Sequence, residues 1–164
     1  MIPVRVLGIA VDTSGQHIVL LKPLDQPAGE GSILPIWIGE QEATSILIAL
    51  GGDEAPRPLT QDLMVTVLDE LDATVEQVAV TRIDDGTFYA ELTLGTPGGE
   101  LVIDARPSDA VGLAVRTEAA LLVAAAVLEE AGIPASLAEQ HDDEAKLEEF
   151  RSFLDTVSPE DFQG

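Results

Sequence analysis

The stretch at residues 100–124 constrains the fold most, because it joins two apolar runs through a short segment dense in charge and hydroxyl. Its first run, residues 101–103, consists of branched side chains and predicts a strand. Residues 110–117 have the composition and apolar spacing of a buried helical face. Pro107 predicts the helix start, since a proline at the first helical position sacrifices no intrahelical hydrogen bond and its fixed φ suits a helix. The stretch therefore predicts a strand that passes directly into a helix.

The junction between these two elements is the first candidate for chemistry. Ser108 and Asp109 fall in the first helical turn, where backbone N–H groups are free and the helix dipole favours an anion. Asp104 and Arg106 end the strand beside them. Arg106 has two interpretations that the residues leave open. It either forms a salt bridge with a neighbouring aspartate or grips a phosphate through its bidentate guanidinium.

The pattern along the chain predicts one mixed domain at residues 1–135 and an acidic helical tail at 136–164. We expect Trp37 to pack in the core or an interface, the strand around Pro35 to be an edge, and Thr60 to be a helix N-cap. The predicted strands are residues 2–12, 17–22, 33–38, 74–84, 87–94, 100–104 and 120–123, and the predicted helices are 40–50, 60–71, 107–117, 124–131 and 142–156.

Charge restricts the partners of this chain. Its 30 acidic and 8 basic residues give a net charge of −22. Electrostatic binding to phosphates needs clustered Lys and Arg, so passive nucleic-acid binding is disfavoured and a nucleic-acid substrate would need divalent cations as mediators. The alternative is that the acidity adapts the surface to a salty cytoplasm.

Several classes of site and location are excluded by what the sequence lacks. It has no cysteine, so disulfides and thiolate metal sites are impossible. We expect a cytoplasmic protein that does not enter a membrane, since no secretory signal or membrane-spanning apolar run is present. Walker A, GxGxxG, HExxH and GxSxG motifs are absent. His17 and His141 lie on a predicted strand surface and in the acidic tail, where neither is a persuasive base.

Acidic residues recur at the predicted helix starts. Residues 36–43 and 103–110 align without gaps as strand, break, acid, alanine and helix, which suggests an internal duplication, although the few identities also fit chance. A duplicated unit would bring the acidic helix starts together. Dipole stabilisation alone explains acids in first turns, whereas convergence would let them hold Mg²⁺ or Mn²⁺ by oxygen. The candidate metal ligands are Glu40, Glu42, Asp62 and Asp109.

Four segments resemble the bifunctional nuclease family: LPIWIGEQEA (34–43), RPLTQDL (57–63), DGTFYAEL (85–92) and DARPSDAVGLAVR (104–116). The tail at 148–162 is similar to that of actinobacterial members. The resemblance implies an α+β domain with a mixed, strongly curved sheet packed by helices, a homo-oligomer, and nuclease activity on DNA and RNA as in plant relatives. The family normally has a histidine where this chain has Gln61, and glutamine cannot act as a base.

The leading hypothesis is a metal-assisted nuclease with Mg²⁺ or Mn²⁺. Its candidate catalytic residues are Asp62, Asp104, Arg106, Ser108 and Asp109, with Arg106 and Ser108 contacting phosphate. The second hypothesis is a catalytically weak or inactive oligomeric binding or regulatory module of the same fold, motivated by Gln61 and the charge. The third gives the junction residues only packing and capping roles.

Overall fold

The computed structural model describes residues 1–52 and 55–137. The helix predicted at 142–156 and the acidic tail from residue 138 onward lie outside the described residues, and the boundary between residues 135 and 136 stays a prediction. No described helix combines the length and the apolar composition needed to cross a bilayer.

The described residues form an α+β fold around one open, mixed, eight-stranded sheet, which confirms the predicted fold class. The strand order is β6-β5-β4-β7-β1-β2-β3-β8, and β4–β7 is the parallel pair while the other pairs are antiparallel. The strands are β1 (Ile2–Val11), β2 (His17–Pro23), β3 (Ser32–Ile38), β4 (Thr74–Asp84), β5 (Thr87–Thr96), β6 (Gly99–Ala105), β7 (Ala120–Val123) and β8 (Ile133–Pro134). The helices are α1 (Glu40–Gly51), α2 (Thr60–Glu70), α3 (Pro107–Thr117) and α4 (Ala125–Ala131).

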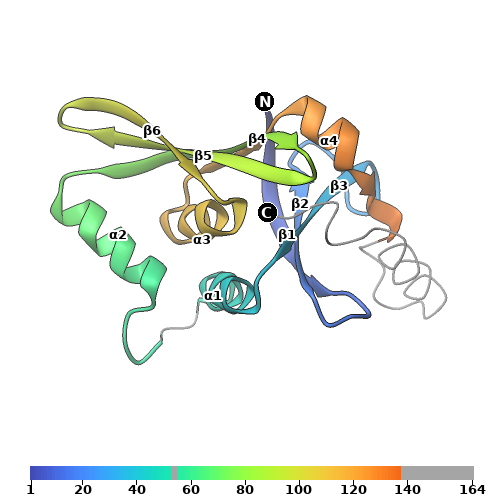
Figure 1. Cartoon of the computed structure of the whole chain (residues 1–164), viewed down its shortest axis with the longest axis horizontal. Coiled ribbons are helices and arrows are strands. Elements are labelled where there is room, and N and C mark those ends of the chain that lie inside the picture. Colours follow the sequence, from blue (N-terminus) through green and yellow to red (C-terminus); the bar gives the residue numbers. More distant parts are fainter. Residues whose placement is uncertain (53–54, 138–164) are drawn as a thin grey trace.

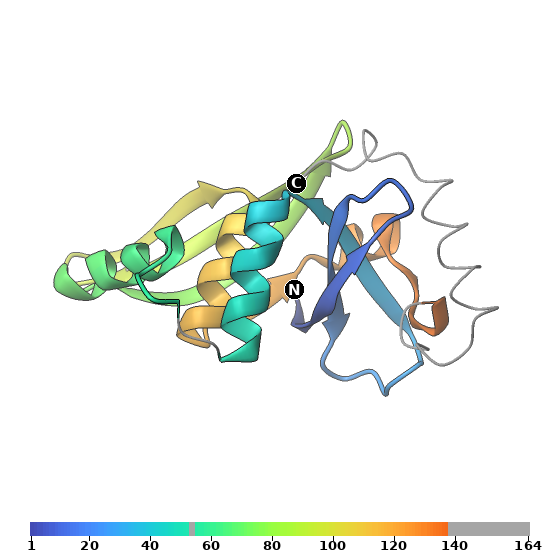
Figure 2. The same cartoon turned by 90° about the horizontal axis from the view of Figure 1, so that it is seen from below.

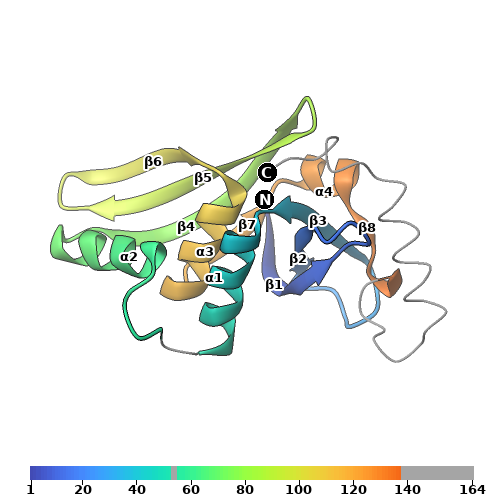
Figure 3. The ribbon, with the colours of Figure 1, turned by 60° about the horizontal axis from the view of Figure 1, so that its bottom comes forward.

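The sheet bends between two halves, β6-β5-β4 and β1-β2-β3-β8 (Figure 1), which the short strand β7 joins (Figure 3). Helices α1 and α3 lie side by side, with α2 beyond α3, on one side of β4–β6 (Figures 2 and 3). Helix α4 contacts β3 and β4. Since α1 follows β3 and α3 follows β6, the two neighbouring helices come from different halves of the sheet.

The core is aliphatic, as the composition predicts. Helix α3 is its centre, because apolar residues on most sides of it are buried. A helix that is apolar nearly all round is stable only when other elements enclose it, and here α1, α2 and the sheet do so. Trp37 is buried as predicted, and its indole Nε1 donates a hydrogen bond to Asp12 Oδ2 at 3.1 Å.

Two local predictions need adjustment. The prediction that Thr60 caps α2 was wrong, because Leu59 is the N-cap and Thr60 is the first helical residue. Leucine has no acceptor, and Asp62 instead accepts a hydrogen bond from the Leu59 N–H at 2.8 Å. Pro35 was expected on an edge strand. β3 has β8 as a neighbour on its far side, but β8 pairs only with Ser32 and Ile33. Pro35 therefore pairs with Leu20 of β2 on one side and with no described strand on the other.

Gly39 and Arg106 are the N-caps of α1 and α3, and both have φ −69° with ψ 157° and 140°, respectively. The N-caps of α2 and α4 have similar angles, so this geometry is common to helix starts and does not test the duplication. An internal duplication as the origin of this similarity stays a hypothesis.

Candidate functional site

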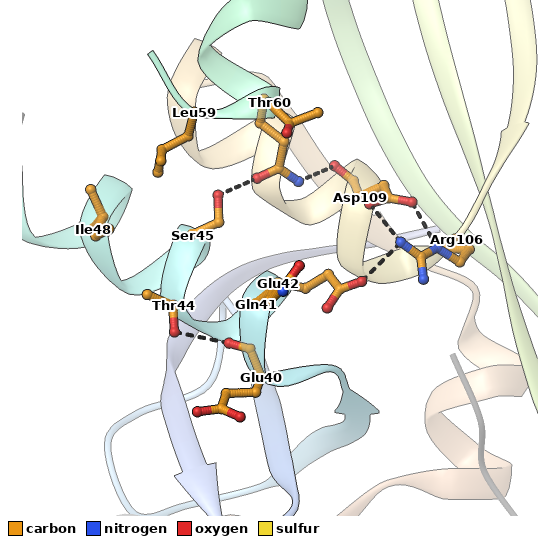
Figure 4. Close-up of a pocket in the computed structure, with 11 residues that line it drawn as sticks. Glu40, Gln41, Glu42, Thr44, Ser45, Ile48, Leu59, Thr60, Arg106 and Asp109 are labelled. Carbon is orange, nitrogen blue, oxygen red and sulfur yellow. Dashed lines mark hydrogen bonds and ion pairs between the residues drawn. The ribbon is translucent and has the colours of Figure 1, made fainter. Parts of the chain in front are cut away.

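A pocket of about 680 Å³ lies where α1, α2 and α3 begin (Figure 4). Its size falls within the range typical of small-molecule sites, about 300–1,000 Å³. Most of its lining residues have polar side chains, and they come from the first three turns of α1, the start of α2 and the start of α3. The lining residues are Glu40, Gln41, Glu42, Thr44, Ser45, Ile48, Leu59, Thr60, Gln61, Arg106 and Asp109.

Arg106 is fixed at one end of the pocket by two carboxylates. Its Nε and Nη2 donate to the two Asp109 oxygens at 2.8 and 3.0 Å, and Nη2 also donates to Glu42 Oε1 at 3.0 Å. Both Nη2 hydrogens are therefore used, whereas Nη1 has no partner among the described residues. The Asp109 carboxylate raises the pKa of the Arg106 guanidinium further above its usual range. Arg106 thus lines the pocket with a permanent positive charge and two uncommitted N–H groups, and 58% of its side chain is exposed.

The Gln61 side chain lies at the centre of a second network. Its Oε1 accepts hydrogen bonds from Ser45 Oγ at 2.7 Å and from Arg116 Nη1 at 3.1 Å, and its Nε2 donates to the Asp109 backbone carbonyl at 3.3 Å. Gln61 is only 8% exposed. Both ends of its amide thus bind neighbouring groups, and it has no group that can accept a proton from water.

Gly112 makes room for this amide. A Cβ built on Gly112 would approach Gln61 Nε2, Oε1 and Cδ more closely than 3.0 Å, a separation that real Cβ atoms do not show. Any larger residue at position 112 therefore displaces Gln61. Glycine in a helix interior costs about 1 kcal/mol relative to alanine, so this position gives up helix stability for close packing against α2.

Arg116 is the buried counterpart of Arg106, at the other end of α3. Its guanidinium donates to Asp62 Oδ1 at 2.6 Å, to the Gly112 carbonyl at 3.0 Å, and to the Ser45 hydroxyl at 2.9 Å. The side chain is 8% exposed. A buried charge is tolerated when it is paired and hydrogen-bonded in this way. Arg116 therefore connects the three helices that build the pocket.

Asp62 is occupied by structural partners. One oxygen accepts from Arg116 and the other from the Leu59 N–H. These bonds lower the pKa of Asp62, with the Arg116 hydrogen bond as the larger cause and the Leu59 N–H as the next. Asp62 does not line the pocket and lies instead in an adjoining cavity beside Arg116.

The remaining predicted site residues differ in whether they line the pocket. Glu40 lines the pocket. Ser108 is 1% exposed and lies outside the lining. Asp104 is exposed on β6, opposite Glu91 of β5, and it does not line the pocket either. The structure thus brings Glu40, Glu42, Arg106 and Asp109 together and leaves Asp62, Asp104 and Ser108 outside the pocket.

The carboxylates have the oxygen chemistry that Mg²⁺ and Mn²⁺ prefer, but their arrangement does not fit an ion. Within residues 1–52 and 55–137, no three acidic or histidine side chains lie close enough to hold a metal together. Glu42 and Asp109 converge on Arg106, which fills the space where an ion would lie.

Sequence reasoning did not single out Ser45, Gly112 or Arg116. Arg116 carried a usable signal, because it is one of only eight basic residues and follows a buried apolar helix face. Ser45 carried none, since serine at an interior helix position is common and its partners lie far away in sequence.

The fold and the site define an α+β protein whose polar pocket is built from the starts of three helices and presents one fixed guanidinium among carboxylates. The chain belongs to the bifunctional nuclease family, because the model of the bifunctional nuclease domain matches residues 19–136.

Similar proteins occur in bacteria and plants. An uncharacterized protein of Mycobacterium tuberculosis H37Rv is 38% identical over 167 residues, covering 98% of this chain and 97% of that protein. Bifunctional nuclease 1 of Oryza sativa subsp. japonica is 29% identical over 122 residues, covering 73% of this chain and 36% of that protein. Bifunctional nuclease 2 of Arabidopsis thaliana is 30% identical over 98 residues, covering 58% and 30%, respectively. The plant proteins are thus much longer than their matched region.

Proposed function

We propose that this protein hydrolyses phosphodiester bonds of DNA, RNA or both in the pocket at the starts of α1, α2 and α3. The observation that supports this most is Arg106, which belongs to the family's motif, lines the pocket and is held by Asp109 and Glu42, while its Nη1 group has no partner among the described residues. A preorganised cation of this kind is suited to stabilise the negative charge that grows on a phosphate in the transition state.

In this proposal Arg106 contacts a non-bridging phosphate oxygen, and Glu40 positions the attacking water. Glu40 is suited to this role because it lines the pocket and its side chain forms no ion pair with a described residue. The water oxygen forms a bond to phosphorus while the bond to one sugar oxygen breaks. One proton leaves the water and one reaches the departing oxygen, so the products are a phosphate monoester and an alcohol.

Mg²⁺ or Mn²⁺ remains part of the proposal as a condition to test. Glu42 and Asp109 could bind an ion only after Arg106 withdraws from them, since they are its hydrogen-bond partners. Activity that survives chelation would remove the metal from the proposal and keep the nuclease function.

The test is cleavage of single-stranded DNA and RNA by the full chain in MgCl₂, MnCl₂ and EDTA. Arg106→Gln should lower kcat about 10²–10³-fold, the usual cost of one transition-state donor, and Glu40→Gln should also lower it. Glu91→Gln, an exposed carboxylate on β5, is the matched control. Asp104→Asn tests one of the sequence-based candidates outside the pocket. Equal rates for the wild type, Arg106→Gln and Glu40→Gln would overturn the proposal.

A non-enzymatic binding or regulatory module of the same fold is the second candidate function. The hydrogen bonds of Gln61 favour it, because both ends of the amide are committed to protein partners and none acts as a base. Nucleotide binding without cleavage under any of the three metal conditions would support this alternative. Metal-dependent or metal-independent turnover that requires Arg106 would refute it.

A second copy of the chain is the partner we propose. One side of α2 is apolar and exposed at Leu63, Val67 and Leu71, and β6 exposes Leu101 and Ile103 at the same end of the molecule (Figure 1). Exposed apolar surface of this extent is typical of an interface, and a two-fold axis would let identical faces cover one another. Val67→Lys should convert an oligomer to a monomer in light scattering; a wild-type monomer would refute the proposed oligomer.

A cytoplasmic location also belongs to the proposal.

A further inference from the structure

The pocket has two chemically different ends. Arg106 and Asp109 lie at one end, and the apolar side chains of Ile48 and Leu59 lie together at the other (Figure 4). Glu42, the second partner of Arg106, and Ile48 are six residues apart on α1. A rise of 1.5 Å per residue separates them by about 9 Å. This is comparable to the length of one nucleotide from its phosphate to its base.

Neutral hydrogen-bonding groups line the space between the two ends. The side chains of Gln41 and Thr60 both face the pocket, and neither has a hydrogen-bond partner among the described residues. An amide and a hydroxyl both donate and accept hydrogen bonds. They can therefore pair with sugar hydroxyls or with the edge of a base without adding charge.

We infer that the pocket accepts one unpaired nucleotide, with its phosphate at Arg106 and its base between Ile48 and Leu59. This inference rests on the proposed function and deepens it, because it makes single-stranded RNA or DNA the substrate class and excludes intact duplex. The apolar end is the part of the pocket that suits a base, since planar nucleobases bury their faces against apolar side chains. A site meant only for phosphate would have no use for that end.

Electrostatics also disfavours a duplex. Binding along a duplex needs several Lys or Arg residues placed along the phosphate backbone, yet within residues 1–52 and 55–137 Arg106 is the one basic residue that lines the pocket. Lys22 and Arg116 are buried and cannot contact a backbone. Extruding a base from a duplex costs a few kcal/mol, and a protein of charge −22 offers no attraction to offset that cost.

The test is titration of the full chain with uridine 5′-monophosphate, uridine and inorganic phosphate, followed by methyl NMR and calorimetry. We expect the Ile48 and Leu59 methyl signals to shift with the monophosphate and with uridine, but not with phosphate. Leu47 is the matched control, since it is exposed on the same helix and does not line the pocket. Ile48→Ala should weaken binding of the monophosphate about ten-fold or more and leave phosphate binding unchanged, whereas Leu47→Ala should change neither.

Phosphate binding as tight as that of the monophosphate, or equal shifts at Leu47 and Ile48, would overturn the inference. A competition arm compares a single-stranded 12-mer with the same sequence in a hairpin duplex, and equal competition would also overturn it. The binding arms need no turnover, so they separate the two proposals. Nucleotide binding without cleavage refutes the nuclease function and keeps the pocket assignment. Cleavage that depends on Arg106 but proceeds equally on duplex and after Ile48→Ala refutes the pocket assignment alone.

Discussion

Gly112→Ala should destabilise the protein, although alanine is the better helix former. The new methyl group would overlap the Gln61 amide, so the Gln61 side chain, which extends from α2, must move away from α3. Three hydrogen bonds to Gln61 are then lost, from Ser45, from Arg116 and to the Asp109 carbonyl. At about 0.5–1.5 kcal/mol each, the loss is about 1.5–4.5 kcal/mol. Alanine returns about 1 kcal/mol of helix propensity, which leaves a net destabilisation of about 2 kcal/mol.

The same substitution should reverse sign when Gln61 is first changed to alanine. The three atoms nearest to the new methyl group all lie beyond the Cβ of Gln61, so Gln61→Ala removes them. Gly112→Ala then keeps only its propensity gain and should stabilise by about 1 kcal/mol. The coupling energy between the two positions is therefore about 3 kcal/mol, at the upper end of the range for residues in contact.

Urea unfolding of the wild type, both single variants and the double variant measures this coupling. The melting temperature of Gly112→Ala should fall by about 4–8 °C, given about 2–4 °C per kcal/mol for a chain of this size. Gly8→Ala is the control, because a Cβ at Gly8 meets nothing within 4 Å. Gly8→Ala should change the free energy of unfolding by the same amount in the wild-type and the Gln61→Ala backgrounds. Gly112→Ala that stabilises equally in both backgrounds would refute the close packing of Gln61 on α3.

Four further outcomes are expected. Gln61→His should raise nuclease turnover by supplying a base next to Ser45 and the Asp109 carbonyl, whereas Gln61→Met should not; equal rates in cleavage assays would contradict this. Arg116→Met should cost about 2–4 kcal/mol in urea unfolding, because Asp62 and Ser45 lose a buried cation; a loss below about 1 kcal/mol would count against it. Because the pKa of the Asp62 carboxyl is lowered in the folded protein, ionised Asp62 stabilises the fold above a pH of about 4, and this contribution is lost as the pH falls through the lower folded pKa. The difference in unfolding free energy between the wild type and Asp62→Asn should therefore shrink from about pH 4 to about pH 2. A difference that stays constant over this range would exclude the ion pair. Raising KCl from 0.1 to 1 M should raise the melting temperature, since it shortens the screening length from about 10 to 3 Å for a chain of charge −22; no rise would show that self-repulsion is small.

The backbone was largely predictable because local chemistry determines it. Pro107 places the start of α3, and Asp85-Gly86 connects β4 to β5 with Asp85 at φ 49° and Gly86 at φ 74°, the left-handed conformation that this dipeptide favours. The N-cap of α2 was missed for a physical reason. Thr60 has the right chemistry for a cap, but the helix starts at Thr60 itself, and Asp62 at the third helical position fixes that start by accepting a hydrogen bond from the Leu59 N–H.

The site was only half predictable, because charge pairing across long sequence separations determines it. Acids at helix starts could be counted in the sequence, but whether each faces the pocket or a basic partner could not. Asp62 pairs with Arg116, which is 54 residues away. Glu42 pairs with Arg106 and stays in the pocket. Asp62 and Asp109 both lie in the first turn of a helix and look equivalent in sequence. Arg116 binds Asp62 outside the pocket, whereas Asp109 lines the pocket.

The origin of α1 and α3 in different halves of the sheet determines when the site can exist. Glu42 and Arg106 meet across 64 residues of chain, so closing that loop carries an entropic cost that nearby contacts do not offset. Contacts of long sequence separation are slow to form. A nascent chain that has emerged only as far as β5 has Glu40 and Glu42 without Arg106. A chain whose sheet halves have not joined through β7 has all three residues without a pocket. Formation of the site therefore coincides with completion of the fold.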